Sequence, residues 1–230
     1  MVRSLLGLLA VVSVVALASA AGPEASTTGA RTGMVDPRML VLQRSDLPDG
    51  FRLDAGHYRS NAWVAGQITD PVFGNRHRTL LKLKRLGRIN GYEADYLPPS
   101  STSSSTPSNF NNAAVLAAAS IYRTTAGAHD AFGWRIPGAP EVPVDFTIQR
   151  GTGSRRRIPL GRPLGDDRLF LRYVYRQQGR PLVDYVLVWR EGKALGALSA
   201  FGVTPTFPAS VFLALVSAQD SRMRKAAQAG

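Results

Sequence analysis

The chain contains no cysteine among its 230 residues. This absence excludes disulfide bonds and thiolate metal ligands, and it also excludes a lipid-modified cysteine after a signal peptide. A chain of roughly 200 residues or more buries enough apolar surface to fold without such covalent support. If it is exported, a protein without disulfides is more typical of bacteria than of a eukaryotic secretory route.

Long apolar runs are also scarce, and the clearest one lies at the start of the chain. Residues 5–17 are small or apolar and follow Arg3, and Ala18-Ser19-Ala20 has the small-x-small form of a signal-peptidase site. The run is shorter than the roughly 20 apolar residues of a spanning helix. We therefore predict a signal peptide over residues 1–20, cleaved after Ala20, and a secreted protein without a transmembrane segment in its mature chain. Residues 21–35, which are mostly small and polar, are predicted to form a flexible leader.

Acidic residues are few: the chain has 16 of them against 28 Lys and Arg, for a formal charge of +12. Only Arg3 belongs to the predicted signal peptide, so the charge of the mature chain is +11. Such a charge attracts anionic partners, which for an exported protein are anionic envelope polymers, acidic glycans or an acidic lipid surface. Nucleic acid is disfavoured by export. A charge spread over the surface that only aids solubility is the open alternative.

Motifs of catalysis and cofactor binding are missing. The sequence has no G-x-S-x-G elbow, no P-loop and no dinucleotide fingerprint. No histidine has a partner at metal-ligand spacing; the three histidines are His57, His77 and His129. We therefore predict no catalytic residues, no metal and no cofactor.

Two pairs of carboxylates are the remaining candidates for hydrolysis or cation binding. Asp166 and Asp167 are adjacent, and Glu141 lies close to Asp145 in sequence. Carboxylate pairs are common by chance, and Asp166-Asp167 follows Gly165 directly before a strand, as in a turn. A non-catalytic role is the simpler interpretation.

The apolar periodicity predicts an α+β fold in one domain over residues 36–226. We expect an antiparallel sheet of about five strands, including a meander over residues 168–201, with helices packed mainly on one face. The predicted strands are 88–97, 168–176, 181–190 and 193–201, with 112–123 ambiguous between strand and helix; the predicted helices are 62–86 with a break at Asp70-Pro71, 126–134 capped by Thr125, 208–226, and a short helix begun by Asp36-Pro37. A serine-rich surface loop is expected at about 98–109.

The meander carries specific expectations of register. A two-residue loop at Glu191-Gly192 would place Trp189 opposite Ala194. A four-residue loop at 177–180 would place Arg172 across from Tyr185 and Arg168 across from Trp189, where each pair could form a cation–π contact. A slip of one residue would move these side chains to the other face.

Arginines supply the predicted ligand site. The planar forks of arginine suit phosphate and carboxylate groups, and the densest run of them lies near residue 156. The candidate ligand-binding residues are Arg155, Arg156, Arg157, Arg168, Arg172, Tyr185 and Trp189. A solvated loop is the alternative for the run itself. A second basic segment, residues 78–88, could lie on an anionic membrane as an amphipathic helix, or be a core helix with a solvated face.

Short motifs along the chain add a resemblance. They are Asp46-Leu47-Pro48-Asp49-Gly50-Phe51, Gly87-Arg88 with Gly91-Tyr92, Tyr122-Arg123, Gly127-Ala128, Ala131-Phe132, Leu164-Gly165-Asp166, Val188-Trp189-Arg190 and Ala218-Gln219-Asp220. In this combination the chain resembles uncharacterised exported proteins of high-GC Gram-positive bacteria, of the actinobacterial type. Its Asp-Leu-Pro-x-Gly-aromatic turn is similar to one in mycobacterial lipoproteins and extracellular sensor domains. The resemblance implies a strand over 115–123 followed by the helix over 126–134, and it carries over no functional residues.

These observations favour an exported, non-catalytic domain that binds an anionic ligand of the cell envelope or the extracellular space. A secreted hydrolase that uses carboxylates such as Asp145, Asp166 or Asp167 is one alternative. A protein–protein interaction module of the cell envelope is the other.

Overall fold

The structure is a computed structural model that describes residues 35–67, 76–98, 113–136, 139–143, 153–177, 180–203 and 208–229. The chain divides into two compact units, residues 1–32 and 33–230, and every described residue belongs to the second. The predicted signal peptide lies outside the described residues, as do the leader before Val35, the Asp70-Pro71 break and the serine-rich loop beyond Pro98.

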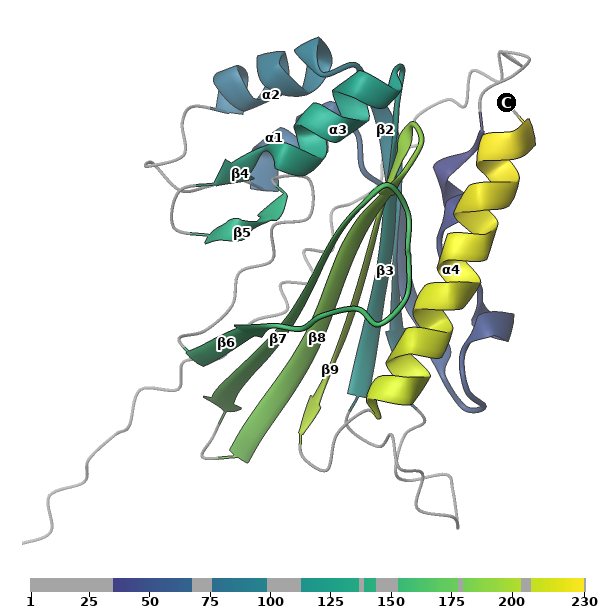
Figure 1. Ribbon diagram of the computed structural model, residues 1–230, viewed down its shortest axis with the longest axis vertical. Coiled ribbons are helices and arrows are strands. Elements are labelled where there is room, and N and C mark those ends of the chain that lie inside the picture. Colours follow the sequence, from purple (N-terminus) through teal and green to yellow (C-terminus); the bar gives the residue numbers. More distant parts are fainter. Residues whose placement is uncertain are drawn as a thin grey trace, which may run out of the picture. The chain divides into compact units, whose positions relative to one another are not determined.

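A seven-stranded antiparallel sheet forms the centre of the second unit, in the order β1-β2-β3-β9-β8-β7-β6 (Figure 1). Its strands are β1 (Arg52–Tyr58), β2 (Arg88–Leu97), β3 (Ala113–Tyr122), β6 (Gly153–Arg157), β7 (Asp167–Gln177), β8 (Arg180–Glu191) and β9 (Ala194–Val203). A separate two-stranded sheet pairs β4 (Arg135–Ile136) with β5 (Ala139–Pro143). The α+β class and the antiparallel meander are confirmed, and the ambiguous segment 112–123 forms a strand over Ala113–Tyr122.

The expected number of about five strands is wrong, because the main sheet has seven. The two strands that the sequence did not predict, β1 and β6, are the two edges of the sheet. Nearly every residue of β1 is exposed, and so are the described side chains of β6. An edge strand with little buried surface lacks the apolar alternation by which strands are recognised, and charge on an edge is typical of natural sheets.

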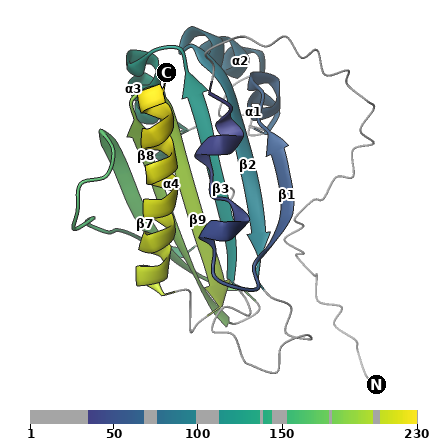
Figure 2. The same ribbon diagram turned by 90° about the vertical axis from the view of Figure 1, so that its right-hand side faces the viewer.

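One face of the sheet is covered by the C-terminal helix α4 (Ala209–Ala229) and by the 3₁₀ helix η1 (Pro37–Leu40) (Figure 2). Phe212, Leu215 and Met223 of α4 are buried here against Leu187 and Trp189 of β8. A second 3₁₀ helix, η2 (Arg44–Asp46), is tied to α4 by Arg222, whose Nε and Nη2 donate to the carboxylate of Asp46 at 2.8 and 2.9 Å. The predicted helix over 208–226 is therefore confirmed as the cover of this face.

The opposite face is covered at one end by helix α3 (Thr125–Gly133), so the expectation of helices mainly on one face is wrong (Figure 1). Ala128 and Ala131 of α3 pack against Val186, Val188 and other buried residues of this face. A strand that is apolar on both sides, as β8 is, requires cover on both sides. Thr124, not Thr125, caps α3: its hydroxyl accepts the backbone N–H of Gly127 at 3.0 Å.

Helices α1 (Asn61–Gln67) and α2 (Arg76–Arg85) confirm the predicted helical segment. They share a small core formed by Val64, Ala65 and Leu83, with Trp134 packed against it. The basic side chains of α2 face outward, and its buried residues are Thr79 and Leu83. No helix among the described residues is long and apolar enough to span a membrane.

The meander has the predicted faces, but both of its turns differ from the expectation: Gln177 and Arg180 are paired with each other, so the four-residue loop at 177–180 is wrong, and the β8–β9 turn has another frame. Arg172 lies opposite Tyr185 and Arg168 opposite Trp189, as predicted, although the β7–β8 pairing extends to Gln177 and Arg180. In the β8–β9 hairpin, Trp189 lies opposite Gly196 and not Ala194, because the turn is Gly192-Lys193 and Glu191 is still paired with Ala194. Gly192 has φ 55°, a left-handed conformation that glycine adopts without strain. The error is two positions in the partner strand, an even number, so each side chain keeps its face.

Candidate functional site

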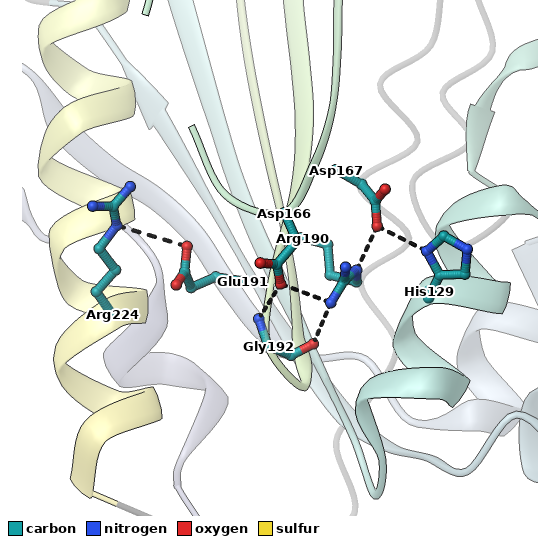
Figure 3. A network of polar contacts seen from close by, with 7 residues as sticks. All are labelled: His129, Asp166, Asp167, Arg190, Glu191, Gly192 and Arg224. Carbon is teal, nitrogen blue, oxygen red and sulfur yellow. Dashed lines mark hydrogen bonds and ion pairs between the residues drawn. The ribbon is translucent and has the colours of Figure 1, made fainter. Parts of the chain in front are cut away.

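A network of charged side chains surrounds the β8–β9 hairpin (Figure 3). Its centre is Arg190, whose side chain is 9% exposed. Nε of Arg190 donates to Oδ2 of Asp167 at 2.5 Å, and Nη1 donates to Oδ2 of Asp166 at 2.7 Å and to the carbonyl oxygen of Gly192 at 3.2 Å. The backbone N–H of Gly192 donates to the same Asp166 oxygen at 3.0 Å. One guanidinium thus joins the start of β7 to the turn after β8.

Helix α3 contributes His129 to this network. Its Nδ1 lies 3.0 Å from Oδ2 of Asp167, and the imidazole is 62% exposed. Burial acts to raise the pKa of Asp167, but the hydrogen bonds from Arg190 and His129 outweigh it and hold that pKa below its usual value. Asp167 is therefore ionised at neutral pH and links the sheet to α3.

On the other side of the hairpin, Glu191 faces α4. Its carboxylate lies 3.6 Å from Nε of Arg224, which also pairs with Asp220 at 3.0 Å. Burial raises the pKa of Glu191 and that of Asp220, and Arg224 opposes the rise in both. The hairpin is therefore linked through Asp167 to His129 of α3 on one side, and by the ion pair of Glu191 with Arg224 to α4 on the other (Figure 3).

The adjacent carboxylates considered for hydrolysis are bound as acceptors in the fork of Arg190. A general acid must hold a proton near neutral pH, and the lowered pKa of Asp167 opposes this. The geometry favours an anchor of the hairpin over acid–base chemistry. Asp145 lies outside the described residues. Among the residues that the structure does describe, no group of three His, Asp or Glu side chains is arranged to hold a metal ion.

The predicted ligand residues come from three neighbouring strands at one edge of the sheet. Arg156 of β6, Arg172 of β7 and Tyr185 of β8 are directly paired in register, so their side chains form a row on the face that α4 covers in part. Arg168 lies on the same face, four residues from Arg172 along β7. Arg155 is paired with Tyr173 and belongs to the opposite face, as does Arg157, which is paired with Leu171.

Trp189 lies apart from this row, beneath α4, with an exposed fraction of 0%. Its ring fills the space above Gly196, where an added Cβ would come within 2.9 Å of it. Tyr185 is half-buried, and its ring centroid lies 5.6 Å from that of Phe212 in α4. Trp189 thus packs the core, whereas Tyr185 keeps part of its ring at the surface.

The predicted cation–π contacts of Arg168 and Arg172 are not among those formed by the described residues. The contacts that form are Arg59 over Trp63, at 5.2 Å from the ring centroid, and Lys82 over Trp134, at 4.2 Å. Trp189 is covered by α4, which leaves no open ring face for Arg168.

Four of the predicted arginines have no counter-ion among the residues that the structure describes. Within the described part of the chain, no ion pair involves Arg156, Arg157, Arg168 or Arg172. Arg156 and Arg172 are moreover direct cross-strand partners. Like charges directly opposite one another on neighbouring strands are destabilising, so this pair is an arrangement that a bound anion would relieve.

A second polar cluster lies at the opposite edge, on β1 and β2. Nε of the buried Arg59 lies 3.4 Å from Oε2 of Glu93, and Nε2 of His57 lies 3.9 Å from Oε1 of the same carboxylate. The His57 ring lies 4.8 Å from that of Trp63. These contacts attach the exposed strand β1 and helix α1 to β2.

Asp95, two residues after Glu93, destabilises the fold when its carboxyl group is ionised. Burial, together with repulsion from Glu93 and Asp54, raises its pKa from 3.8 to about 6. Since the folded-state pKa lies above the unfolded-state value, the fold loses stability as the pH rises from about 4 to about 6. Asp95→Asn is expected to raise the free energy of unfolding at pH 7 by about 1–2 kcal/mol, after allowance for partial exposure, and to give no gain below pH 4.

Urea unfolding at pH 4 and pH 7 measures this difference, with Asp49→Asn at an exposed position as the control. An equal effect of Asp95→Asn at both pH values would contradict burial as its cause.

Sequence reasoning placed Asp166 and Asp167 in a turn but did not identify Arg190 or His129 as their partners. The available signal was Arg190 itself, the one basic residue within the apolar segment 182–190. A buried arginine requires an acidic partner, and the nearest unassigned acidic pair was Asp166-Asp167. His129 gave no such signal, because its contact depends on how α3 lies on the sheet.

Comparison with known proteins gives weak structural similarity. No family model and no curated protein matches the chain. The crystal structure of the extracellular domain of PknH from Mycobacterium tuberculosis is similar with a TM-score of 0.38 and 9% identity, over 83% of this chain and 97% of that one. The structure of an uncharacterized protein (Rv0999 ortholog) from Mycobacterium smegmatis is similar with a TM-score of 0.34 and 12% identity, over 83% and 84%. The resemblance predicted from the motifs has no support at the level of a sequence family.

Proposed function

We propose that this chain is an exported, non-catalytic domain that binds an anionic polymer of the cell envelope through the row formed by Arg156, Arg172 and Tyr185. The observation that carries the proposal is the direct pairing of Arg156 with Arg172 on one face, where neither has a counter-ion among the described residues. Two guanidinium groups held side by side on a sheet offer paired N–H donors to a phosphate or carboxylate.

The surroundings of the row support the same role. Arg168, on the same face, extends the positive charge along β7. Tyr185 supplies a partly exposed ring next to Arg172, as is common where a surface binds sugars or other flat groups. Because β6 is an edge strand, a long polymer can reach the row without entering a closed cavity.

Retention of the mature protein on immobilised poly(glycerol phosphate), measured as salt is raised, tests the proposal. The double variant Arg156→Gln/Arg172→Gln is expected to bind about tenfold more weakly or worse, since a hydrogen bond to a charged group contributes about 1.5–3 kcal/mol. Its apparent affinity should also depend less steeply on salt.

The matched control is Lys84→Gln/Arg85→Gln, which removes the same charge from the exposed side of α2. Retention of this variant should equal that of the unaltered protein. An equal loss of retention in both double variants would show that only net charge matters. A loss of retention in the α2 variant alone would place the site on the basic helix. No retention of the unaltered protein at low salt would refute the proposal.

A further inference from the structure

A cavity of about 480 Å³ lies at the end of the sheet where β3 ends and the β8–β9 hairpin turns. Its walls come from η1, from the start of α3 and from the last turns of α4. None of its lining residues belongs to the arginine row of the proposed function. The cavity therefore represents a separate feature, and its volume falls within the range of pockets that hold small molecules.

The floor of the cavity is aliphatic. Half-buried Val35, Ile89, Ile121 and Ala226 line it, and Met223 is buried at its base. The free energy of binding becomes more favourable when an apolar group displaces water from such a surface. It does not by itself select a ligand, and the selection must come from the polar groups at the rim.

Two cations mark the rim. Arg123 and Lys193 are exposed: Arg123 directly follows β3, and Lys193 lies in the turn directly before the neighbouring strand β9. The N–H of Tyr122 donates to the carbonyl oxygen of Lys193 at 2.9 Å, which holds the two positions close together. Neither side chain forms an ion pair within the described part of the chain. Thr125, also in the lining, is the first residue of α3, so the positive end of the helix dipole adds to the same field.

One acidic residue, Glu191, belongs to the lining, and its carboxylate is turned to Arg224 of α4 at 3.6 Å (Figure 3). Burial raises its pKa, and Arg224 opposes the rise. The charge of the described lining is therefore positive on balance, since two cations and a helix N-terminus stand against one carboxylate that is already paired with Arg224.

We infer that this cavity binds a small amphiphile with one carboxylate, such as a medium-chain fatty acid. Its apolar chain lies on Ile89, Ile121 and Met223, and its carboxylate is held between Arg123 and Lys193. The inference is independent of the proposed polymer-binding function, because the two sites share no residue. It would make the domain a carrier or sensor of a small acidic lipid component outside the cell.

Calorimetric titration of the mature protein with decanoate tests the inference. One equivalent is expected to bind, and decyltrimethylammonium, which has the same chain and the opposite charge, is expected to bind at least tenfold more weakly. Lys193→Gln should weaken decanoate binding about fivefold to tenfold, whereas Lys84→Gln on α2 should leave it unchanged. Equal binding of the two probes, or no binding of decanoate, would overturn the inference.

Two further measurements locate the ligand. The methyl resonance of Met223 should shift on addition of decanoate, while that of Met39, which is 58% exposed and outside the lining, should not. Ala226→Trp should fill the cavity and abolish binding; if this variant is misfolded, the Met223 shift and Lys193→Gln remain decisive. The variant Arg156→Gln/Arg172→Gln should bind decanoate normally, so failure of this inference and failure of the proposed function are distinguishable.

Discussion

Replacing Arg190 with alanine is expected to lower the free energy of unfolding by about 3 kcal/mol, because it leaves two carboxylates and a turn without their shared donor. Arg190 donates to Asp166, Asp167 and the carbonyl oxygen of Gly192, and its side chain is 9% exposed. Arg190→Lys should lose roughly half as much, since a single ammonium group cannot reproduce the two-pronged geometry of guanidinium. Urea unfolding at neutral pH, with the slope unchanged between variants, measures both losses.

Arg224→Ala provides the matched control. Arg224 also pairs with two acidic residues of the region, Glu191 and Asp220, but its side chain is 49% exposed. Ion pairs in contact with water contribute about 0–1 kcal/mol, so the loss should be several times smaller than for Arg190→Ala. Equal losses in the two variants would contradict the assignment of Arg190 as the anchor of the hairpin.

The pH dependence of the stability lost in Arg190→Ala gives an independent check of the Arg190–Asp167 pair. The folded-state pKa of Asp167 lies below its unfolded-state value of 3.8, so the stabilisation from this pair is complete above that value and is lost as the pH falls through the folded-state pKa. The difference between Arg190→Ala and the unaltered protein should therefore be largest near neutral pH. This difference in the free energy of unfolding should become smaller as the pH falls below 3.8.

The interior of the sheet could be predicted from the sequence because burial leaves a pattern. Residues 182–190 are apolar on both faces, and the strand they form lies inside the sheet with neighbours on both sides. The edges left no comparable pattern. Strand β6 consists of glycine, serine and three arginines, and its pairing with β7 has no apolar pattern of its own to reveal it.

The β8–β9 hairpin shows which part of a turn its own residues predict and which part they do not. The sequence Glu191-Gly192-Lys193 predicts a tight turn, but two frames are possible, with the glycine at the second or the first central position. The ion pair of Glu191 with Arg224 and the bonds of Gly192 to Asp166 and Arg190 accompany the second frame. These partners are distant in sequence, so the choice depends on tertiary contacts that periodicity does not contain.

The candidate sites also combine features that the sequence predicts with features that depend on tertiary contacts. The residues of the arginine row were identified from their chemistry, and their common face followed from strand register. The burial of Trp189 depends on where α4 lies, and the cavity requires five segments of the chain to meet at one end of the sheet. Neither can be read from spacing along the chain.

Gly127→Ala is expected to destabilise the fold by about 2–4 kcal/mol, because the added methyl group would enter the position of a backbone atom. Its Cβ would meet the carbonyl oxygen of Leu86 well inside van der Waals contact and would lie 3.1 Å from Oγ1 of Thr124, the N-cap of α3. A backbone carbonyl cannot rotate away as a flexible side chain can. Relief therefore requires α3 to move away from Leu86, which lies between α2 and β2, or to lose its cap, which itself contributes about 1 kcal/mol.

Gly133→Ala, in the same helix, is the control for Gly127→Ala. An added Cβ at Gly133 meets no atom within 4 Å, so this variant should be neutral or slightly more stable, since alanine is a better helix former than glycine. Thermal unfolding of the two variants compares them directly. Because Thr125 at the start of α3 lines the cavity, Gly127→Ala should also weaken decanoate binding, while Gly133→Ala should not. A similar loss of stability in both variants would show that α3 tolerates alanine poorly in general. The contact of Gly127 with Leu86 would then not be the cause of the loss.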